Sequence, residues 1–163
     1  IIIASFFIGH LSADSIRLII GVIAVLFCLN YWIGGKLRGP KKSGAISGWL
    51  WGMVAGFTST QIHAGGPPVS IYLLPQNLDR MVLMGTMAIF FTVMNYLKLI
   101  PYTLLGAFDS SNLLTSLVLM PLAPIGVKLG YLTIQKVSQK TIYRFLYVAL
   151  FLSGLKLLFD GLI

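Results

Sequence analysis

Long apolar blocks separated by short polar stretches dominate the chain. Such blocks occupy residues 16–35, 81–106, 111–132 and 141–162, and residues 1–9 resemble the end of another. A helix rises ~1.5 Å per residue, so about 20 apolar residues cross the ~30 Å hydrocarbon core of a bilayer. The pattern therefore predicts an all-α fold, a polytopic bundle of transmembrane helices.

The apolar segment 44–76 is interrupted where the other blocks are continuous. It contains Gly65-Gly66-Pro67-Pro68, and helix interiors lose about 1 kcal/mol at Gly and ~3 kcal/mol or more at Pro. A helix is expected to end there. Two arrangements fit: a re-entrant helical hairpin that returns to its starting side, or a single kinked span.

Basic residues favour the hairpin. The loop 36–42 holds four cations and no acid, so the positive-inside bias places it in the cytosol. The loop 133–140 with its flanks is also basic, and it falls on the same side only if segment 44–76 enters and returns. The outer loops are then 10–15 with Asp14 and 107–110 with Asp109, and the C-terminus lies outside. The cations of the inner loops are Lys36, Arg38, Lys41, Lys42, Lys128, Lys136, Lys140 and Arg144.

Composition agrees with a membrane protein. The chain is 57% hydrophobic and 10% charged, and its net charge of +8 comes from 12 Lys and Arg against 4 Asp. Positive-inside bias explains this charge more simply than a nucleic-acid partner, which we do not expect. Cys28 stands alone, so neither a disulfide nor a cysteine metal site is expected. The start at Ile1 lacks the features of a signal peptide, and we expect a piece of a longer protein.

The interrupted segment is the first candidate site. A half-helix starting at Pro67 would offer free N–H groups and a positive dipole end, which favour an anion. Gly65 and Gly66 would let a ligand approach the backbone closely. A purely structural kink or a surface loop is the alternative. Polar side chains precede the break: Thr58, Ser59, Thr60, Gln61 and His63.

A lysine within block 81–106 is the second candidate. Phe91, Asn95, Lys98 and Tyr102 are spaced to share one helical face. Ionisable residues inside a membrane are costly and usually functional, although a lysine can also snorkel to the interface. Lys98 beside a half-helix N-terminus would form a positive pocket for a small anion.

Missing patterns also narrow the function. All four Asp lie near block ends, so no buried carboxylate is available to couple protons or sodium. There is no serine-hydrolase elbow, zinc-protease motif, P-loop or cysteine pair. Pairing Ser59 or Ser70 with His63 as a protease has no support from spacing. We expect no enzyme activity, no cofactor and no metal.

Several motifs together resemble the sulfite exporter TauE/SafE family. Residues 56–68 (Gly-Phe-Thr-Ser-Thr-Gln-Ile-His-Ala-Gly-Gly-Pro-Pro) and Tyr72-Leu73-Leu74 are similar to its second signature. The likeness continues, in order, through Leu78-Asp79-Arg80, Phe90-Phe91, residues 95–102 (Asn-Tyr-Leu-Lys-Leu-Ile-Pro-Tyr), residues 121–126 (Pro-Leu-Ala-Pro-Ile-Gly), Leu129-Gly130, Tyr143-Arg144 and residues 153–158 (Ser-Gly-Leu-Lys-Leu-Leu).

The resemblance implies a bacterial inner-membrane permease with two related halves, each opening with a Gly-rich broken segment. Residues 1–35 would end the first half, 36–43 form the cytosolic loop, and 44–163 form the second half. That half would comprise hairpin 44–76 and helices 81–106, 111–132 and 141–162. Its odd number of crossings inverts the two halves relative to each other. Family members can be homodimers. The pocket residues carried over are Thr58, Ser59, Gln61, His63, Gly65, Gly66, Pro67, Asn95 and Lys98.

The resulting interpretation is a secondary transporter of small, sulfur-containing anions such as sulfite or organosulfonates, working by alternating access. The half-helix end and glycine turn would hold the anion. Ser59, Gln61 and Asn95 would donate hydrogen bonds, and Lys98 would supply charge. The alternatives are a channel for water or a small neutral solute, and a membrane assembly subunit without transport.

Overall fold

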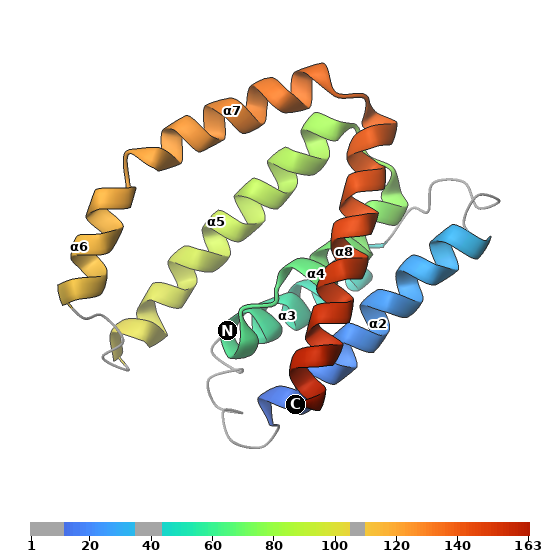
Figure 1. Cartoon of the computed structure of the whole chain (residues 1–163), viewed down its shortest axis with the longest axis horizontal. Coiled ribbons are helices and arrows are strands. Elements are labelled where there is room, and N and C mark those ends of the chain that lie inside the picture. Colours follow the sequence, from blue (N-terminus) through green and yellow to red (C-terminus); the bar gives the residue numbers. More distant parts are fainter. Residues whose placement is uncertain (1–11, 35–43, 105–109) are drawn as a thin grey trace.

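The structure, a computed structural model, describes residues 12–34, 44–104 and 110–163 (Figure 1). Every regular element in this part is a helix, and α2, α5 and α8 are long and apolar enough to span a membrane. The predicted all-α membrane bundle is thus confirmed. The predicted basic loop 36–42 and the helix end 1–9 lie outside the described residues, as does Asp109. The elements are α2 (Ala13–Gly34), α3 (Ala45–Ile62), α4 (Gly66–Leu73), the 3-10 helix η2 (Leu74–Gln76), α5 (Arg80–Leu104), α6 (Ser110–Leu119), α7 (Leu122–Lys136) and α8 (Gln139–Leu162).

Helices α2 and α8 form a close antiparallel pair. Their contacts step by seven residues in opposite directions: 14 with 161, 21 with 154, and 28 with 147. A Cβ added to Gly21 would lie 2.9 Å from the carbonyl oxygen of Gly154. Small residues allow such backbone approach, which drives helix association within lipid. Glycine therefore fixes both the separation and the register of this pair.

Aromatic rings fill the other end of the same pair. The Tyr31 and Tyr147 rings stack with centroids 3.7 Å apart, and Trp32 meets Phe151 at 5.1 Å. Tyr147 is 2% exposed, and its carbonyl oxygen lies 3.5 Å from the sulfur of Cys28. Cys28 is accordingly a small packed residue, as its position in an apolar block indicates.

Helices α3 and α4 form a helical hairpin. Gly65, just before α4, lies against Ala55 and Ser59 of α3, and Tyr72 near the end of α4 lies against Gly48. Helix α4 therefore runs back along α3 instead of continuing its direction. At eight residues it is too short to cross a bilayer. Whether the hairpin enters and leaves on the same side of the membrane stays a prediction.

The buried apolar residues gather where the hairpin meets α2 and α8. Helix α4 contributes three of them, and α2 and α8 surround it. We call α2, α3, α4 and α8 the core. Members of this buried cluster are Ala24, Cys28, Ala55, Val69, Ile71, Leu73, Leu74, Tyr143, Tyr147 and Leu150, joined by Leu83 and Met94 of α5.

Helices α5, α6 and α7 form a second part, which we call the arm. Block 111–132 was predicted as one helix, but α6 ends at Leu119 and α7 begins at Leu122 (Figure 1). Pro121 has no N–H, and its ring would clash with the carbonyl of Leu117 in a continuous helix. No residue of α7 is buried in the described structure. Along its length the arm packs sparsely against the core.

Several helix ends meet at one end of the bundle. Arg80, at the start of α5, donates to the carbonyl of Val137 between α7 and α8, and Gln139 donates to the carbonyl of Leu78. The antiparallel pairing places the C-terminus of α2 beside the start of α8. The flanks of loops 36–42 and 133–140 therefore lie at the same end, as the positive-inside argument requires. Their assignment to the cytosol stays a prediction.

Candidate functional site

The turn between α3 and α4 is held by its own hydrogen bonds. Helix α3 ends at Ile62 and is capped by His63, whose φ of 55° is left-handed, and the backbone N–H groups of His63 and Ala64 both donate to the carbonyl of Thr58. The Thr58 hydroxyl donates to the carbonyl of Ala64 at 2.9 Å and approaches that of Ala55 at 3.3 Å. Thr58 is 1% exposed. Its one hydroxyl proton closes the turn instead of facing a ligand.

The two glycines of the turn have different surroundings. A Cβ on Gly65 would lie 2.8 Å from the Ser59 Cβ and 3.2 Å from the Ala55 carbonyl oxygen. A Cβ on Gly66 would meet nothing within 4 Å. Gly65 is therefore required by the return of the chain onto α3. Gly66 instead borders open space at the start of α4, where a ligand could reach the backbone.

The N-terminus of α4 offers fewer donors than predicted. Helix α4 starts at Gly66, one residue before the predicted start at Pro67, and the prolines of its first turn, Pro67 and Pro68, have no N–H. Of the first four helical residues, only Gly66 and Val69 carry the amide protons that a helix start leaves unpaired. Pro67 is buried. The expected row of free amides is thus reduced, and an anion here would need charge from elsewhere.

Lys98 of α5 reaches the end of α3. Its Nζ donates to the Ser59 carbonyl at 2.6 Å, and the residue is 6% exposed. The side chain therefore does not snorkel to the surface. The last four carbonyls of a helix lack helical partners and carry negative dipole charge, so a cation is favourable there. In this arrangement Lys98 caps α3 directly beside the turn.

Lys98 has no acidic partner among the described residues. The chain has four acids. Asp14 pairs with Arg17 at 2.6 Å, and Asp160 with Lys156 at 3.5 Å. The third, Asp79, accepts from the N–H of Met81 at the start of α5, and the fourth lies outside the described residues. A buried charge without a counter-ion is costly, and a bound anion would offset that cost.

The other predicted residues are only partly brought together. His63 is exposed at the turn, and its ring lies 6.3 Å from that of Tyr102, one helical turn beyond Lys98. Ser59 is buried and Gln61 partly buried on the last turns of α3. Asn95 is exposed on the side of α5 next to the buried line through Met94 and Lys98. The structure therefore gathers Thr58, Ser59, His63, Gly65 and Lys98, but not Asn95.

The spacing predicts that Tyr102 shares the Lys98 face, but Tyr102 is not among the nine predicted site residues. The signal that could have selected it is the step of four residues from Lys98. That spacing brings Tyr102 to the turn between α3 and α4, where its ring lies beside that of His63.

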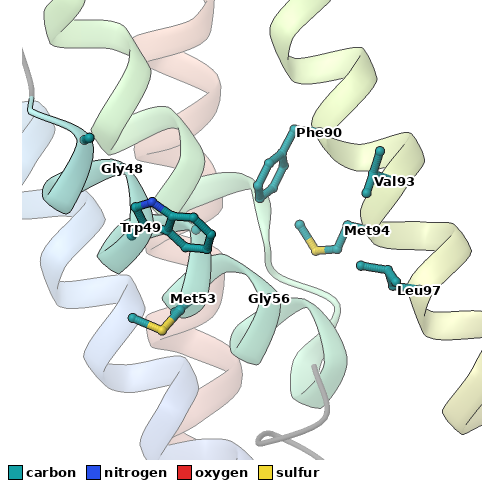
Figure 2. Close-up of a pocket in the computed structure, with 10 residues that line it drawn as sticks. Gly48, Trp49, Met53, Gly56, Phe90, Val93, Met94 and Leu97 are labelled. Carbon is teal, nitrogen blue, oxygen red and sulfur yellow. The ribbon is translucent and has the colours of Figure 1, made fainter.

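An apolar cavity of about 760 Å³ lies between α3 and α5 (Figure 2). In the close-up, Phe90 and Met94 on α5 lie opposite Trp49 on α3. None of the nine predicted site residues lines it. A desolvated anion would find almost no hydrogen-bond donors there, so this groove is not the anion site. Its lining residues are Ala45, Gly48, Trp49, Gly52, Met53, Gly56, Phe90, Val93, Met94 and Leu97.

Comparison with known proteins gives one match. The family described as Sulfite exporter TauE/SafE matches residues 1–157. This range is wider than the motifs from Gly56 onward on which the resemblance rested. No curated protein and no solved structure matches the chain.

Proposed function

Because the chain belongs to the sulfite exporter TauE/SafE family of membrane transporters, we propose that it moves small sulfur-containing anions such as sulfite or organosulfonates. The proposed mechanism is secondary transport by alternating access in a bacterial inner membrane. The homodimer implied by the resemblance stays a prediction.

One observation carries this proposal. Lys98 is a buried cation 2.6 Å from the Ser59 carbonyl, beside a broken helical hairpin and without an acidic partner in the described part of the chain. A neutral solute gains little from such a charge. An anion gains a charge-assisted hydrogen bond, which is shorter and roughly twice as strong as a neutral one.

The proposed anion takes the place of the Ser59 carbonyl as a partner of Lys98. The open space at Gly66 admits it to the N–H of that residue, and the positive end of α4 favours its charge. The Ser59 hydroxyl and the Gln61 amide, on the last turns of α3, are the proposed additional donors. Asn95 is the weakest of the nine proposed contacts because it is exposed on a neighbouring side of α5.

The test is uptake of labelled sulfite, sulfoacetate and chloride into proteoliposomes containing the full-length protein, with and without a proton gradient. We expect saturable flux of one sulfur-containing anion. Hydrogen bonds to charged groups contribute about 1.5–3 kcal/mol, so Lys98→Met should lower uptake roughly 10- to 100-fold. Lys156→Met is the matched control because Lys156 is exposed and already pairs with Asp160.

Normal uptake by Lys98→Met would remove Lys98 from the site. Flux that does not saturate and is not inhibited by competing anions would favour the channel. No flux in any folded variant, together with loss of a complex when Gly65 and Gly66 are replaced, would favour the assembly subunit.

A further inference from the structure

The start of α5 is tied to the turn between α7 and α8 by four hydrogen bonds. The guanidinium of Arg80 donates to the carbonyl of Val137 and, at 3.3 Å, to that of Gln135. In the opposite direction, the Leu78 carbonyl accepts from Gln139 at 3.2 Å and from the Tyr143 hydroxyl at 2.8 Å. We call these four hydrogen bonds the knot; the name refers to the bonds and not to a threaded chain.

The knot satisfies backbone groups that the helices leave open. Helix α7 ends at Lys136, so the carbonyls of Gln135 and Val137 lack helical partners. Arginine presents several donors in a rigid planar fork, which lets one side chain serve two carbonyls at once. Arg80 therefore joins the beginning of α5 to the end of α7, while Gln139 and Tyr143 of α8 join the same place through the Leu78 carbonyl.

Elsewhere the arm is loosely attached to the core. Helix α5 packs sparsely along its length, and the cavity of about 760 Å³ separates its middle from α3. Its second polar attachment is the contact of Lys98 with the Ser59 carbonyl. The helix is thus held by hydrogen bonds at the knot and at Lys98. Between the two, Leu83 and Met94 are buried against the core, and the cavity lies beside Met94.

Lever geometry links these two points. Lys98 follows Arg80 by 18 residues, a rise of about 27 Å. A tilt of ~10° at the knot would displace Lys98 by roughly 5 Å along that length. Such a shift exceeds the 2.6 Å length of its contact with Ser59. The position of the cation therefore depends on how firmly the far end of α5 is held.

We propose that Arg80 is a positioning residue, the pivot that holds α5 against the α7–α8 turn while the Lys98 end of the arm moves during transport. The role in transport rests on the proposed function, but the pivot itself is a mechanical property that can be measured without substrate.

The experiment is pulsed electron–electron spin resonance on the full-length protein in lipid, with Cys28 replaced by Ser. One pair of spin labels, at the exposed positions Thr103 on α5 and Leu152 on α8, measures the distance between the arm and the core, which we call the arm distance. A control pair, at Ile33 and Leu162, reports the core alone. In Arg80→Ala, the distribution of arm distances should broaden, or its mean should shift by several ångströms. The distribution of core distances, from the control pair, should keep its width. Arg80→Lys, which retains charge but loses the planar fork, should give an intermediate result.

Uptake measured on the same variants separates positioning from a structural role. A displaced Lys98 should raise the KM for the anion more than it lowers the maximal rate, and Arg80→Lys should restore part of the loss.

Gln139→Ala removes one donor of the knot and serves where Arg80→Ala does not fold. It should broaden the distribution of arm distances less. Unchanged arm distances in Arg80→Ala, or in Gln139→Ala where only that variant folds, would overturn the pivot, whatever happens to transport. Broadened arm distances in a protein that moves no anion would keep the pivot and reject the proposed function.

Discussion

The α2–α8 pair and α5 are built from similar apolar sequence but are held in place differently. All three helices are long and apolar enough to span a membrane. Helices α2 and α8 meet through glycines whose backbones nearly touch. Helix α5 instead meets the core through side-chain hydrogen bonds at the knot and at Lys98, with only Leu83 and Met94 buried in the apolar cluster. Apolar length thus predicts a span but does not predict what the span packs against.

This difference follows from the membrane as solvent. Lipid tails are as apolar as leucine, so burial of apolar surface gives little drive for one helix to join another. Close shape complementarity or hydrogen bonds must supply it. The core uses the first, which resists displacement, and the arm uses the second, at points that can exchange partners. We expect the core to be the fixed part and the arm the moving part.

The largest expected effect comes from filling the glycine contact of the core. Gly21→Leu would place side-chain atoms against the backbone of Gly154 and Leu158, each 2.9 Å from an added Cβ. Overpacking of this kind should cost about 3 kcal/mol. Gly85→Leu is the matched change on α5, where nothing lies within 4 Å of an added Cβ, and should stay within about 0.5 kcal/mol. Thermal unfolding in detergent measures both, and equal losses would contradict the contrast.

The next effect separates the two glycines of the turn. Gly65→Ala should cost about 2 kcal/mol and lower anion uptake, because its Cβ meets Ser59 and the Ala55 carbonyl. The Cβ that Gly66→Ala adds would point into open space, so the free energy of unfolding should change by only ~0.5 kcal/mol. Loss of uptake in stable Gly66→Ala would show that the anion occupies this space. Equal destabilisation by both would contradict the hairpin geometry.

Most of the fold could be predicted, because apolar length and helix-breaking residues are local properties. The four adjacent breakers Gly65, Gly66, Pro67 and Pro68 predict a break in segment 44–76, but the chain leaves the helix at residues 63–65, and Gly66, Pro67 and Pro68 form the first turn of α4. Apolar length alone predicts one helix over 111–132 and does not reveal the break at Pro121. The sparse donors of α4 could have been foreseen, since Pro67 and Pro68 have no amide proton.

The site was less predictable because it depends on distant pairs. Burial and snorkelling of Lys98 fit the sequence equally well until Ser59, 39 residues earlier, is found beside it. Asn95 shares a helical face with Lys98 by spacing, yet the buried line of α5 runs through Leu83, Met94 and Lys98. Which face of a helix packs against its neighbours depends on those neighbours and cannot be read from the sequence of the helix alone. Arg80 likewise gave no sign that its partners lie near residue 137.

A smaller effect tests whether Thr58 serves the turn or the substrate. Thr58→Val keeps the shape but leaves the Ala64 carbonyl without its 2.9 Å donor, which should cost about 1–2 kcal/mol. Thr60→Val is the control, since its hydroxyl bonds the Gly56 carbonyl within α3, and should cost about 0.5 kcal/mol. The unfolding midpoint of each variant gives the comparison. Unchanged stability of Thr58→Val with a raised KM would make Thr58 a substrate contact instead.

The smallest effect concerns His63, where backbone strain and ring packing oppose each other. A left-handed residue other than glycine is strained by roughly 1–2 kcal/mol, and His63 has a φ of 55°. His63→Gly relieves that strain but loses the ring contact with Tyr102, an aromatic pair worth about 0.5–1.5 kcal/mol. Its stability should therefore stay near that of the wild type, while His63→Ala, which keeps the strain and loses the ring, should be about 1 kcal/mol less stable.

Equal stability of these two His63 variants would mean that the turn does not depend on a left-handed residue. Uptake by the stable His63→Gly protein then shows whether the imidazole of His63 has a role in the turn or in binding the anion. Transport at the wild-type level would make His63 part of the hinge between α3 and α4. Loss of uptake without loss of stability would place its ring against the anion, because no structural change would be left to explain the loss.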